Sequence, residues 1–236
     1  MNKEAFYKKL EENNIQLTEY QKEQFKIYCE YLLDYNKHTN LTAIKDEEGV
    51  YLKHFYDSAS VAFIYDLKEE KILDIGTGAG FPGVVLKKLF PQINLTLIDS
   101  NNKKTTFLKK LLEKINISDV KVLNDRVENI KDKESFDIVI SRAVSELRIL
   151  AELSLPYLII GGKVIALKSH IDEEIQKAKD TIEILGGSNA KIIDLNISNM
   201  LGKRCLVEII KEKNTPEIYP RVYDKILKYP LKKITK

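Results

Sequence analysis

The 236-residue sequence has no tryptophan, only two cysteines and no long uninterrupted apolar run. Cys29 and Cys205 belong to no Cys-x-x-Cys pair, so no zinc site is predicted and both thiols are expected to stay reduced. No apolar stretch approaches the roughly 18 residues that a membrane span needs. The charged amino-terminal segment lacks the apolar region of a secretion signal. We therefore expect a cytoplasmic protein with no membrane partner and no bound metal.

Positive charge is concentrated near the carboxyl terminus. The whole chain has a net charge of only +3, but residues 203–236 contain ten Lys and Arg against four Asp and Glu. A basic segment on a mildly acidic body is typical of proteins that bind polyanions, although such segments also serve solubility alone. Charge by itself therefore leaves binding to nucleic acid open.

The apolar pattern divides the chain into three parts. Residues 1–68 are predicted to form a helical extension, with a capping box at Thr18-Glu-Tyr-Gln21, a polar break at residues 36–40 and one helix over residues 46–66. Strands and helices alternate over residues 69–213, which predicts a parallel sheet covered on both faces. Residues 214–236 are expected to form a basic tail.

Seven strands are predicted in the central part, and the short connection between the last two favours an antiparallel hairpin at the sheet edge. The fold class is therefore α/β and Rossmann-like, with a mostly parallel sheet. The predicted strands span residues 71–75, 95–98, 120–123, 136–140, 163–168, 191–195 and 204–211, and the helices among them span residues 82–89, 103–115, 146–156 and 172–185.

A glycine-rich turn follows the first predicted strand. Lys71-Ile-Leu-Asp-Ile75 runs into Gly76-Thr-Gly-Ala-Gly80, and a helix is expected to open at Pro82. Glycines such as Gly76 and Gly78 permit a tight turn and let a ligand approach the backbone. Phe81 occupies the place of the last glycine in the dinucleotide-binding pattern Gly-x-Gly-x-x-Gly. The turn therefore predicts a nucleoside site and disfavours a nicotinamide dinucleotide.

Two acidic residues accompany this turn. Asp99 ends the next strand, where a carboxylate can accept both hydroxyl groups of a ribose. Asp74 lies at the end of the first strand, where it can meet an amino group. Two acids without a phosphate-binding lysine favour a cationic nucleoside that lacks phosphate, and S-adenosylmethionine fits that description. Lys103 and Lys104, which open the following helix, are expected to be solvated.

The segment after the fourth strand, Ile140-Ser-Arg-Ala143, limits the type of methylation. It has neither the Asn/Asp-Pro-Pro-Tyr/Phe pattern frequent in amino-nitrogen methylases nor the nucleophilic cysteine that pyrimidine C5 methylation needs. A ring nitrogen such as guanine N7 carries an exposed lone pair, so its methylation needs alignment and exclusion of water rather than a general base. The segment is consistent with ring-nitrogen transfer.

Nearly the whole chain resembles the bacterial glucose-inhibited division protein B family, which comprises guanine-N7 methyltransferases of small-subunit ribosomal RNA. The segments that carry the resemblance are Asn40-Leu-Thr42, His54-Phe-Tyr-Asp-Ser58, Leu73-Asp-Ile-Gly-Thr-Gly-Ala-Gly-Phe-Pro-Gly83, Asp99-Ser-Asn-Asn-Lys-Lys104, Phe107-Leu108, Arg126-Val-Glu128, Ser141-Arg-Ala143 and Tyr219-Pro-Arg221. The resemblance implies a class I methyltransferase fold and methylation of one guanine in 16S rRNA. The implied partner is 16S rRNA or the small ribosomal subunit, and we expect a monomer.

The resemblance also assigns cofactor contacts. These are Gly76, Phe81, Asp99, Ser100, Asn101, Val127, Glu128 and Arg142. The family usually has alanine where this chain has Val127, so a contact there would be made by the backbone. In the tail, Asp224 and Ile226 replace the family's glycine and proline, which puts the shape of that loop in doubt but not its basic character.

Basic residues provide candidates for contact with RNA phosphates, which position RNA without reading its sequence. Arg142 follows a strand at the carboxyl end of the sheet, where open α/β sheets bind ligands, so it is also a candidate for positioning the target base. The other candidates are Lys168, Arg204, Arg221 and Lys228.

The residues leave three alternative functions open. The first is a methyltransferase that acts on another RNA, on a protein or on a small molecule. The second is a nicotinamide-dependent enzyme, and the third is a ribosome-assembly factor without catalytic activity.

Overall fold

The computed structural model describes residues 1–142, 145–169, 171–195, 197 and 201–233. Ala143 of the Ser-Arg-Ala segment lies outside the described residues. The chain forms two compact units: unit 1 consists of Met1–Glu69 and Gly76–Asp125, and unit 2 of Glu70–Ile75 and Arg126–Lys236. The boundaries of these two units differ from the boundaries of the three predicted parts. The division into three parts stays a prediction.

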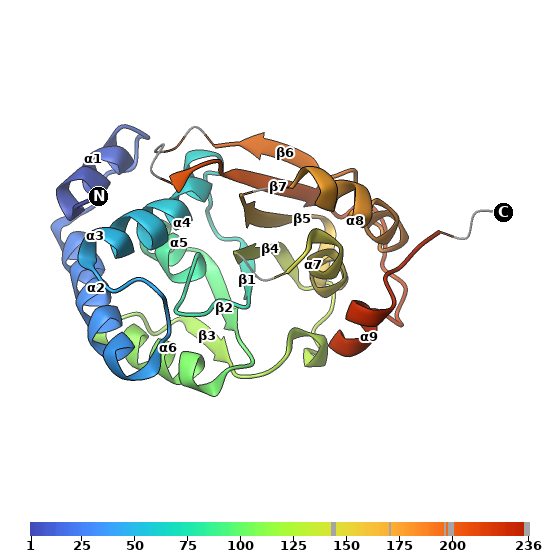
Figure 1. The fold of residues 1–236 in the computed structure, drawn as a ribbon, viewed down its shortest axis with the longest axis horizontal. Helices are drawn as coiled ribbons and strands as arrows, with labels where there is room; N and C mark the ends of the chain where they lie inside the picture. Colours follow the sequence, from blue (N-terminus) through green and yellow to red (C-terminus); the bar gives the residue numbers. More distant parts are fainter. Residues whose placement is uncertain (143–144, 170, 196, 198–200, 234–236) are drawn as a thin grey trace. The chain divides into compact units, whose positions relative to one another are not determined.

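The sheet has the seven predicted strands in the order β3-β2-β1-β4-β5-β7-β6 (Figure 1). Their bounds are β1 (Lys71–Ile75), β2 (Asn94–Ile98), β3 (Val120–Leu123), β4 (Phe136–Arg142), β5 (Leu158–Lys168), β6 (Lys191–Asp194) and β7 (Cys205–Ile210). β1 pairs with β4, β2 with β3 and β4 with β5 in parallel. β7 pairs antiparallel with both β5 and β6, so the predicted fold class and its edge hairpin are confirmed.

Strand register brings predicted site residues of unit 2 to one edge. Asp74 of β1 is opposite Ile140 of β4, and Arg142 at the end of β4 is opposite Leu167 of β5. Because these strands are parallel, their carboxyl ends meet at the same edge of the sheet, which is where ligands bind in open α/β sheets.

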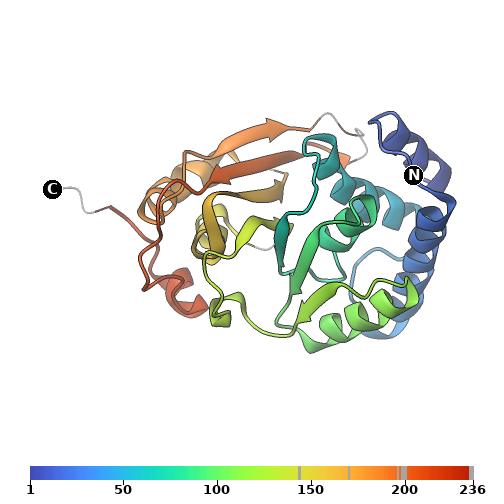
Figure 2. The same ribbon diagram turned by 180° about the vertical axis from the view of Figure 1, so that it is seen from behind.

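The helices of both units are visible from opposite sides in Figures 1 and 2. Unit 1 contains α1 (Lys3–Glu11), α2 (Glu19–Thr39), α3 (Glu47–Val50), the π-helix η1 (Tyr51–Tyr56), α4 (Asp57–Ala59), the 3₁₀-helix η2 (Ser60–Phe63), α5 (Gly83–Leu89) and α6 (Asn102–Lys114). Unit 2 contains the 3₁₀-helices η3 (Val127–Asn129) and η4 (Leu155–Tyr157), together with α7 (Leu147–Ser154), α8 (Asp172–Ile184) and α9 (Tyr223–Lys228).

The amino-terminal helices differ from the prediction in two places. The capping box of α2 is present, since Thr18 and Gln21 exchange hydrogen bonds. The predicted break at residues 36–40 is wrong, because α2 continues to Thr39. Asn36 points inward, where its amide donates to the carbonyl groups of Thr42 and Ile44 at 2.9 and 3.2 Å. Polar composition signalled a break, but this asparagine shapes the loop that follows the helix.

The helix predicted over residues 46–66 is present as an uninterrupted helical stretch from Glu47 to Phe63, but it is not one regular α-helix, because α3, η1, α4 and η2 follow one another within it. The expected inner positions Val50, Phe55 and Ala59 are buried, whereas Phe63 is half-buried. Aromatic rings surround Phe55, with those of Phe25 and Tyr51 both 5.1 Å from it between centroids. Aromatic packing therefore dominates the core of unit 1 here.

In unit 2, α7 and α8 pack side by side (Figure 1). Among the residues that the structure describes, no helix has the length and apolar character to cross a membrane. Cys29 and Cys205 are both buried free thiols, and burial raises the pKa of Cys29 to about 12.

Candidate cofactor site

The glycine turn of unit 1 is held by backbone hydrogen bonds to the end of β2. The amides of Gly76 and Thr77 both donate to the carbonyl group of Ile98, at 2.9 and 3.2 Å. Gly76, Gly78 and Gly80 all have positive φ angles, of 65°, 63° and 101°. Side chains strongly disfavour this region of backbone space, so the turn needs glycine at these positions.

Gly78 and Gly80 differ in what surrounds them. A Cβ atom on Gly80 would lie 2.7 Å from the Tyr28 hydroxyl and 2.7 Å from a methyl group of Val84, so protein fills that space. Among the residues that the structure describes, a Cβ atom on Gly78 would meet only the carbonyl oxygen of Gly76, at 4.0 Å. The side of the turn at Gly78 is therefore open to a ligand, whereas Gly80 is required for packing.

Asp99 lies beside this open side of the turn. Its Oδ2 accepts a hydrogen bond from the Gly78 amide at 3.0 Å, and its Oδ1 accepts one from the Asn101 amide at 2.9 Å. The Lys104 ammonium is 3.4 Å from Oδ2, and its side chain is one-third exposed, so Lys104 is less solvated than expected. A carboxylate has about four acceptor positions. These contacts leave capacity for a ligand hydroxyl.

Phe81 lies between two other rings. It is 4% exposed, and its ring stacks on Tyr28 at 5.4 Å and on His54 at 4.5 Å between centroids. The Tyr28 hydroxyl donates to the carbonyl group of Ala79 at 2.5 Å. The Phe81 ring thus supports the turn from within the core. Sequence reasoning did not identify Tyr28 as a support, because its partners lie more than 50 positions away.

His54 connects the family segments at the amino terminus to this support. Its Nε2 is 2.8 Å from the Thr42 hydroxyl, and the Thr42 amide donates to the side-chain oxygen of Asn36 at 3.0 Å. His54 lies in the π-helix η1, and such turns are frequent at functional sites. Asn40 ends α2 in a left-handed conformation with a φ of 51°. Asn36, Thr42 and His54 thus form a chain of contacts that ends at Phe81.

In unit 2, the ends of β1 and β4 carry further predicted residues. Asp74 is fully buried, and the Ser141 hydroxyl donates to the carbonyl group of Ile75 at 3.0 Å. This bond ties the first residue of the Ser-Arg-Ala segment to the strand that leads into the glycine turn. Arg142 follows as the last residue of β4 and is half-buried.

Val127 and Glu128 are the first two residues of η3. Both accept hydrogen bonds from other residues of unit 2. The Tyr157 hydroxyl donates to the Val127 carbonyl group. Burial and the nearby Glu128 raise the pKa of Tyr157, so it stays a donor at neutral pH. Val127 is 5% exposed, and the Tyr223 amide donates to the Glu128 carboxylate at 3.2 Å. This turn is therefore rigidly placed.

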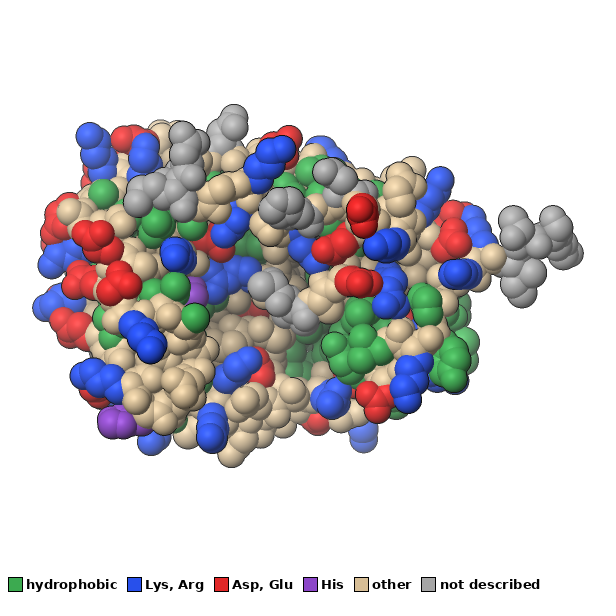
Figure 3. Space-filling model, in the orientation of Figure 1, with side chains coloured by type: hydrophobic (Ala, Val, Ile, Leu, Met, Phe, Trp, Pro, Cys, Tyr) green, Lys and Arg blue, Asp and Glu red, His purple; other side chains and the backbone are tan. Residues whose placement is uncertain are grey.

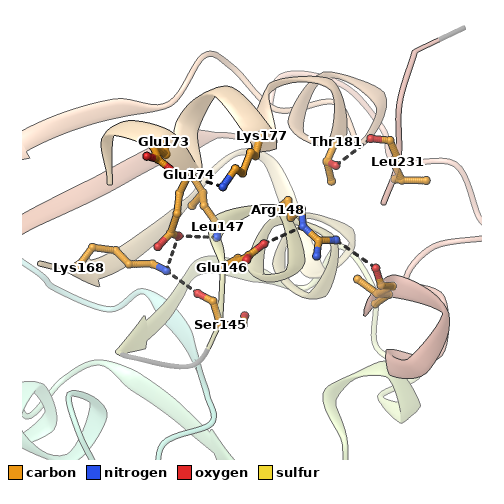
Figure 4. A network of polar contacts seen from close by, with 11 residues as sticks. Ser145, Glu146, Leu147, Arg148, Lys168, Glu173, Glu174, Lys177, Thr181 and Leu231 are labelled. Carbon is orange, nitrogen blue, oxygen red and sulfur yellow. Dashed lines mark hydrogen bonds and ion pairs between the residues drawn. The ribbon is translucent and has the colours of Figure 1, made fainter. Parts of the chain in front are cut away.

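Lys168 belongs to a polar network that holds the start of α7 (Figure 4). Its ammonium donates to the carbonyl group of Ser145 and pairs with Glu174 at 2.8 Å. Glu174 also accepts the Leu147 amide at 2.8 Å. These contacts occupy Lys168 and hold Ser145 and Leu147 at the start of α7.

The other RNA-contact candidates lie in different surroundings. Arg221 forms two hydrogen bonds of 2.7 Å with Glu152, and Glu152 raises the pKa of Arg221. Its guanidinium therefore faces a buried carboxylate. Arg204 donates to the carbonyl group of Lys203 at 3.0 Å, and Lys228 is exposed on α9. No group of three or more His, Cys, Asp or Glu side chains suited to a metal ion occurs in the described part of the chain.

The fold is that of a class I methyltransferase. A methyltransferase structure from Pyrococcus furiosus matches with a TM-score of 0.57 and 16% identity, over 81% of this chain and 99% of that one. The structure of the tRNA (m1A58) methyltransferase TrmI from Aquifex aeolicus matches with a TM-score of 0.55 and 20% identity, over 67% of this chain and 69% of that one.

The sequence comparisons identify the family. The family model GidB, rRNA small subunit methyltransferase G, matches residues 21–201. Ribosomal RNA small subunit methyltransferase G of Staphylococcus carnosus is 42% identical over 99% of this chain and all of its own length, and that of Bacillus cereus is 43% identical over the same shares. The chain belongs to the rRNA small subunit methyltransferase G family, which confirms the family prediction.

Proposed function

We propose that this protein transfers a methyl group from S-adenosylmethionine to N7 of one guanine in 16S rRNA. The observation that carries the proposal is the open glycine turn with Asp99 bonded to Gly78, in a chain of this family. The substrate is 16S rRNA or the small ribosomal subunit, and the protein acts as a monomer in the cytoplasm.

In unit 1, Gly76 and Gly78 supply backbone that a ligand can approach. The Asp99 carboxylate accepts the ribose hydroxyl groups of the cofactor, and the Ser100–Asn101 segment borders the adenosine. The surroundings fit this ligand, because Asp99 is 6% exposed and no side chain of the described part of the chain fills the space next to Gly78. Phe81 contributes through its backbone, since its ring is packed between Tyr28 and His54.

In unit 2, Asp74 meets the amino group of the methionyl part, a role supported by its place two residues before Gly76 along the chain. Val127 and Glu128 border the adenine, with Glu128 accepting a hydrogen bond from it. Arg142 positions the target base or contacts an adjacent phosphate. Bound S-adenosylmethionine supplies an electrophilic methyl group on a sulfonium centre.

Guanine N7 attacks with a lone pair, so the protein's task is alignment and exclusion of water rather than proton removal. Contacts to RNA phosphates come from Arg142, Arg204 and the exposed Lys228. We omit Lys168 and Arg221 from these contacts, because carboxylates already occupy both cations. Few cations would therefore contact RNA phosphates directly. The affinity for rRNA should fall only moderately as the salt concentration rises.

The proposal can be tested in a gene-deleted strain. Borohydride reduction and aniline cleavage of its rRNA should show loss of 7-methylguanosine at one position of the small-subunit rRNA. The native gene should restore the modification, as should a Lys103→Met variant, whereas Asp99→Asn should not. An unchanged content of 7-methylguanosine in the deleted strain would overturn the proposal.

A further inference from the structure

The carboxyl-terminal segment Tyr219–Lys233, which we call the strap, is docked onto unit 2 along its length. Sequence analysis predicted a basic tail here, yet backbone carbonyl groups of the strap accept hydrogen bonds from three separate elements. The donors are Lys133 to Tyr219, Arg148 to Ile226 and Thr181 to Leu231. The strap is thus part of the folded unit rather than a loose tail.

Arg221 anchors the strap in α7. Its Nε and Nη2 atoms donate to the two carboxylate oxygens of Glu152, both at 2.7 Å, and its backbone amide donates to the same group at 3.1 Å. The Glu152 side chain is 1% exposed and that of Arg221 is 13% exposed. A bidentate pair between a guanidinium and a carboxylate fixes orientation as well as distance. The strap therefore has one defined position on α7.

Two residues further along, the strap reaches the turn at Val127–Glu128. Tyr223 is the first residue of α9, so its amide has no acceptor within the helix. This amide donates to Oε1 of Glu128 at 3.2 Å, and the Arg126 guanidinium lies over the Tyr223 ring at 5.4 Å. The Glu128 side chain is 8% exposed. The Arg126 guanidinium is also 3.8 Å from Oε1 of Glu128, so both Arg126 and the Tyr223 amide hold this carboxylate, and Arg221 holds Tyr223 in place.

The strap also contacts the start of α7. Arg148 lies between the Glu146 carboxylate, at 2.8 Å, and the carbonyl group of Ile226 in α9, at 3.3 Å (Figure 4). On its outer face the strap exposes apolar side chains, among them Val222, Leu227 and Tyr229, and green side chains gather at the α9 end of the face shown in Figure 3. Its backbone and its anchoring charge therefore face inward.

We propose that the strap is a positioning element for the cofactor turn Val127–Glu128, with Arg221 as its anchor and the Tyr223 amide as the group that orients the Glu128 carboxylate. This inference rests on the proposed role of Glu128 as a cofactor contact. The contact between the Tyr223 amide and Glu128 then governs affinity for S-adenosylmethionine, whereas Lys228 of the same strap contributes to rRNA binding.

Two substitutions at one position isolate the amide. Tyr223→Pro removes the N–H group, and proline is well tolerated as the first residue of a helix. The preceding Val222 has an extended conformation, with a ψ of 143°, as a residue before proline requires. Tyr223→Ala keeps the N–H group and removes the ring, so the two variants share the loss of the ring and differ chiefly in the hydrogen bond to Glu128.

Calorimetry with S-adenosylmethionine and filter binding with 16S rRNA should be measured on the full chain. We expect Tyr223→Pro to bind the cofactor about fivefold to tenfold more weakly than Tyr223→Ala, because a hydrogen bond to a charged group is lost. The rRNA affinities of the two variants should agree within about twofold. General destabilisation would not lower the cofactor affinity while leaving the rRNA affinity unchanged.

Equal cofactor affinities, or a loss confined to rRNA binding, would overturn the inference. Native protein that fails to bind S-adenosylmethionine would instead overturn the proposed function. Should Tyr223→Pro not fold, Glu152→Gln provides a second test, because it loosens the anchor while preserving side-chain shape. It should weaken cofactor binding about threefold, and unchanged cofactor binding there would equally overturn the inference.

Discussion

The glycine turn and the strap are both irregular segments, but their partners lie at very different distances along the chain. The turn bonds to the end of the next strand, with Gly78 only 21 positions from Asp99. In the strap, Arg221 is 69 positions from Glu152, and Tyr223 is 95 positions from Glu128. The turn is therefore a local motif, whereas the strap exists only because distant segments have folded together.

The largest expected effect concerns the anchor of the strap. Arg221→Met should lower the free energy of unfolding by about 4 kcal/mol, because it leaves the Glu152 carboxylate buried without a partner. Urea denaturation measures this loss. The double variant Glu152→Gln/Arg221→Met should recover part of it. A loss below about 1 kcal/mol in the single variant would show that the anchor contributes little to holding the strap on α7.

This contrast explains what could be predicted. The glycine turn, Asp99 and all seven strands follow from local patterns, since apolar alternation and turn residues act over a few positions. Arg221 was predicted as an RNA contact because its charge is visible in the sequence, whereas the Glu152 carboxylate that pairs with it becomes its neighbour only in the folded chain. Lys168 illustrates the same limit, because Glu174 and the Ser145 carbonyl group become its partners only in the folded chain.

Errors in the amino-terminal helices have a related cause. The polar run around Asn36 resembles a linker by composition, yet this side chain is buried and bonds the loop at Thr42. The π-helix η1 has no local signature that distinguishes it from an α-helix, since its aromatic residues keep roughly helical spacing. Tertiary contacts decided both outcomes.

The second largest effect concerns the glycine turn. It tests whether substitutions at different glycines of the turn have the same effect on stability. Gly80→Ala should destabilise the protein by about 3 kcal/mol, because the new Cβ atom would overlap the Tyr28 hydroxyl and because alanine would have a strained, positive φ angle. Gly78→Ala should cost only about 1 kcal/mol, from backbone strain alone, but should weaken binding of S-adenosylmethionine. Thermal unfolding with calorimetry distinguishes them, and equal stability losses would contradict the assigned difference between packing and access.

A third test uses pH at the segment that leads into the strap. Lys211 is fully buried, donates to the Leu155 carbonyl group at 2.6 Å, and burial lowers its pKa from 10.5 to about 8. Between pH 8 and pH 10.5, Lys211 has therefore lost its proton in the folded state but keeps it in the unfolded chain. The contribution of Lys211 to stability should rise with pH in this window and stay flat below about 8.

Relative to a Lys211→Met variant, the native protein should therefore gain about 2 kcal/mol between pH 8 and pH 9.5. Denaturation at several pH values gives this difference. Lys88 has its pKa lowered to about 8 by burial as well, and it remains in both proteins, so its effect cancels. A constant difference between the two proteins across this range would mean that the Lys211 ammonium remains protonated within the fold.

The smallest effect concerns the aromatic support beneath the turn. Tyr28→Phe removes the hydroxyl that donates to the Ala79 carbonyl group but keeps the ring stacked on Phe81. We expect a loss of about 1 kcal/mol in stability, typical of one neutral hydrogen bond, with little change in affinity for S-adenosylmethionine. If affinity for the cofactor fell strongly instead, the turn would depend on a partner 51 positions away as much as the strap depends on Glu152, and the distinction between a local motif and a long-range one would fail.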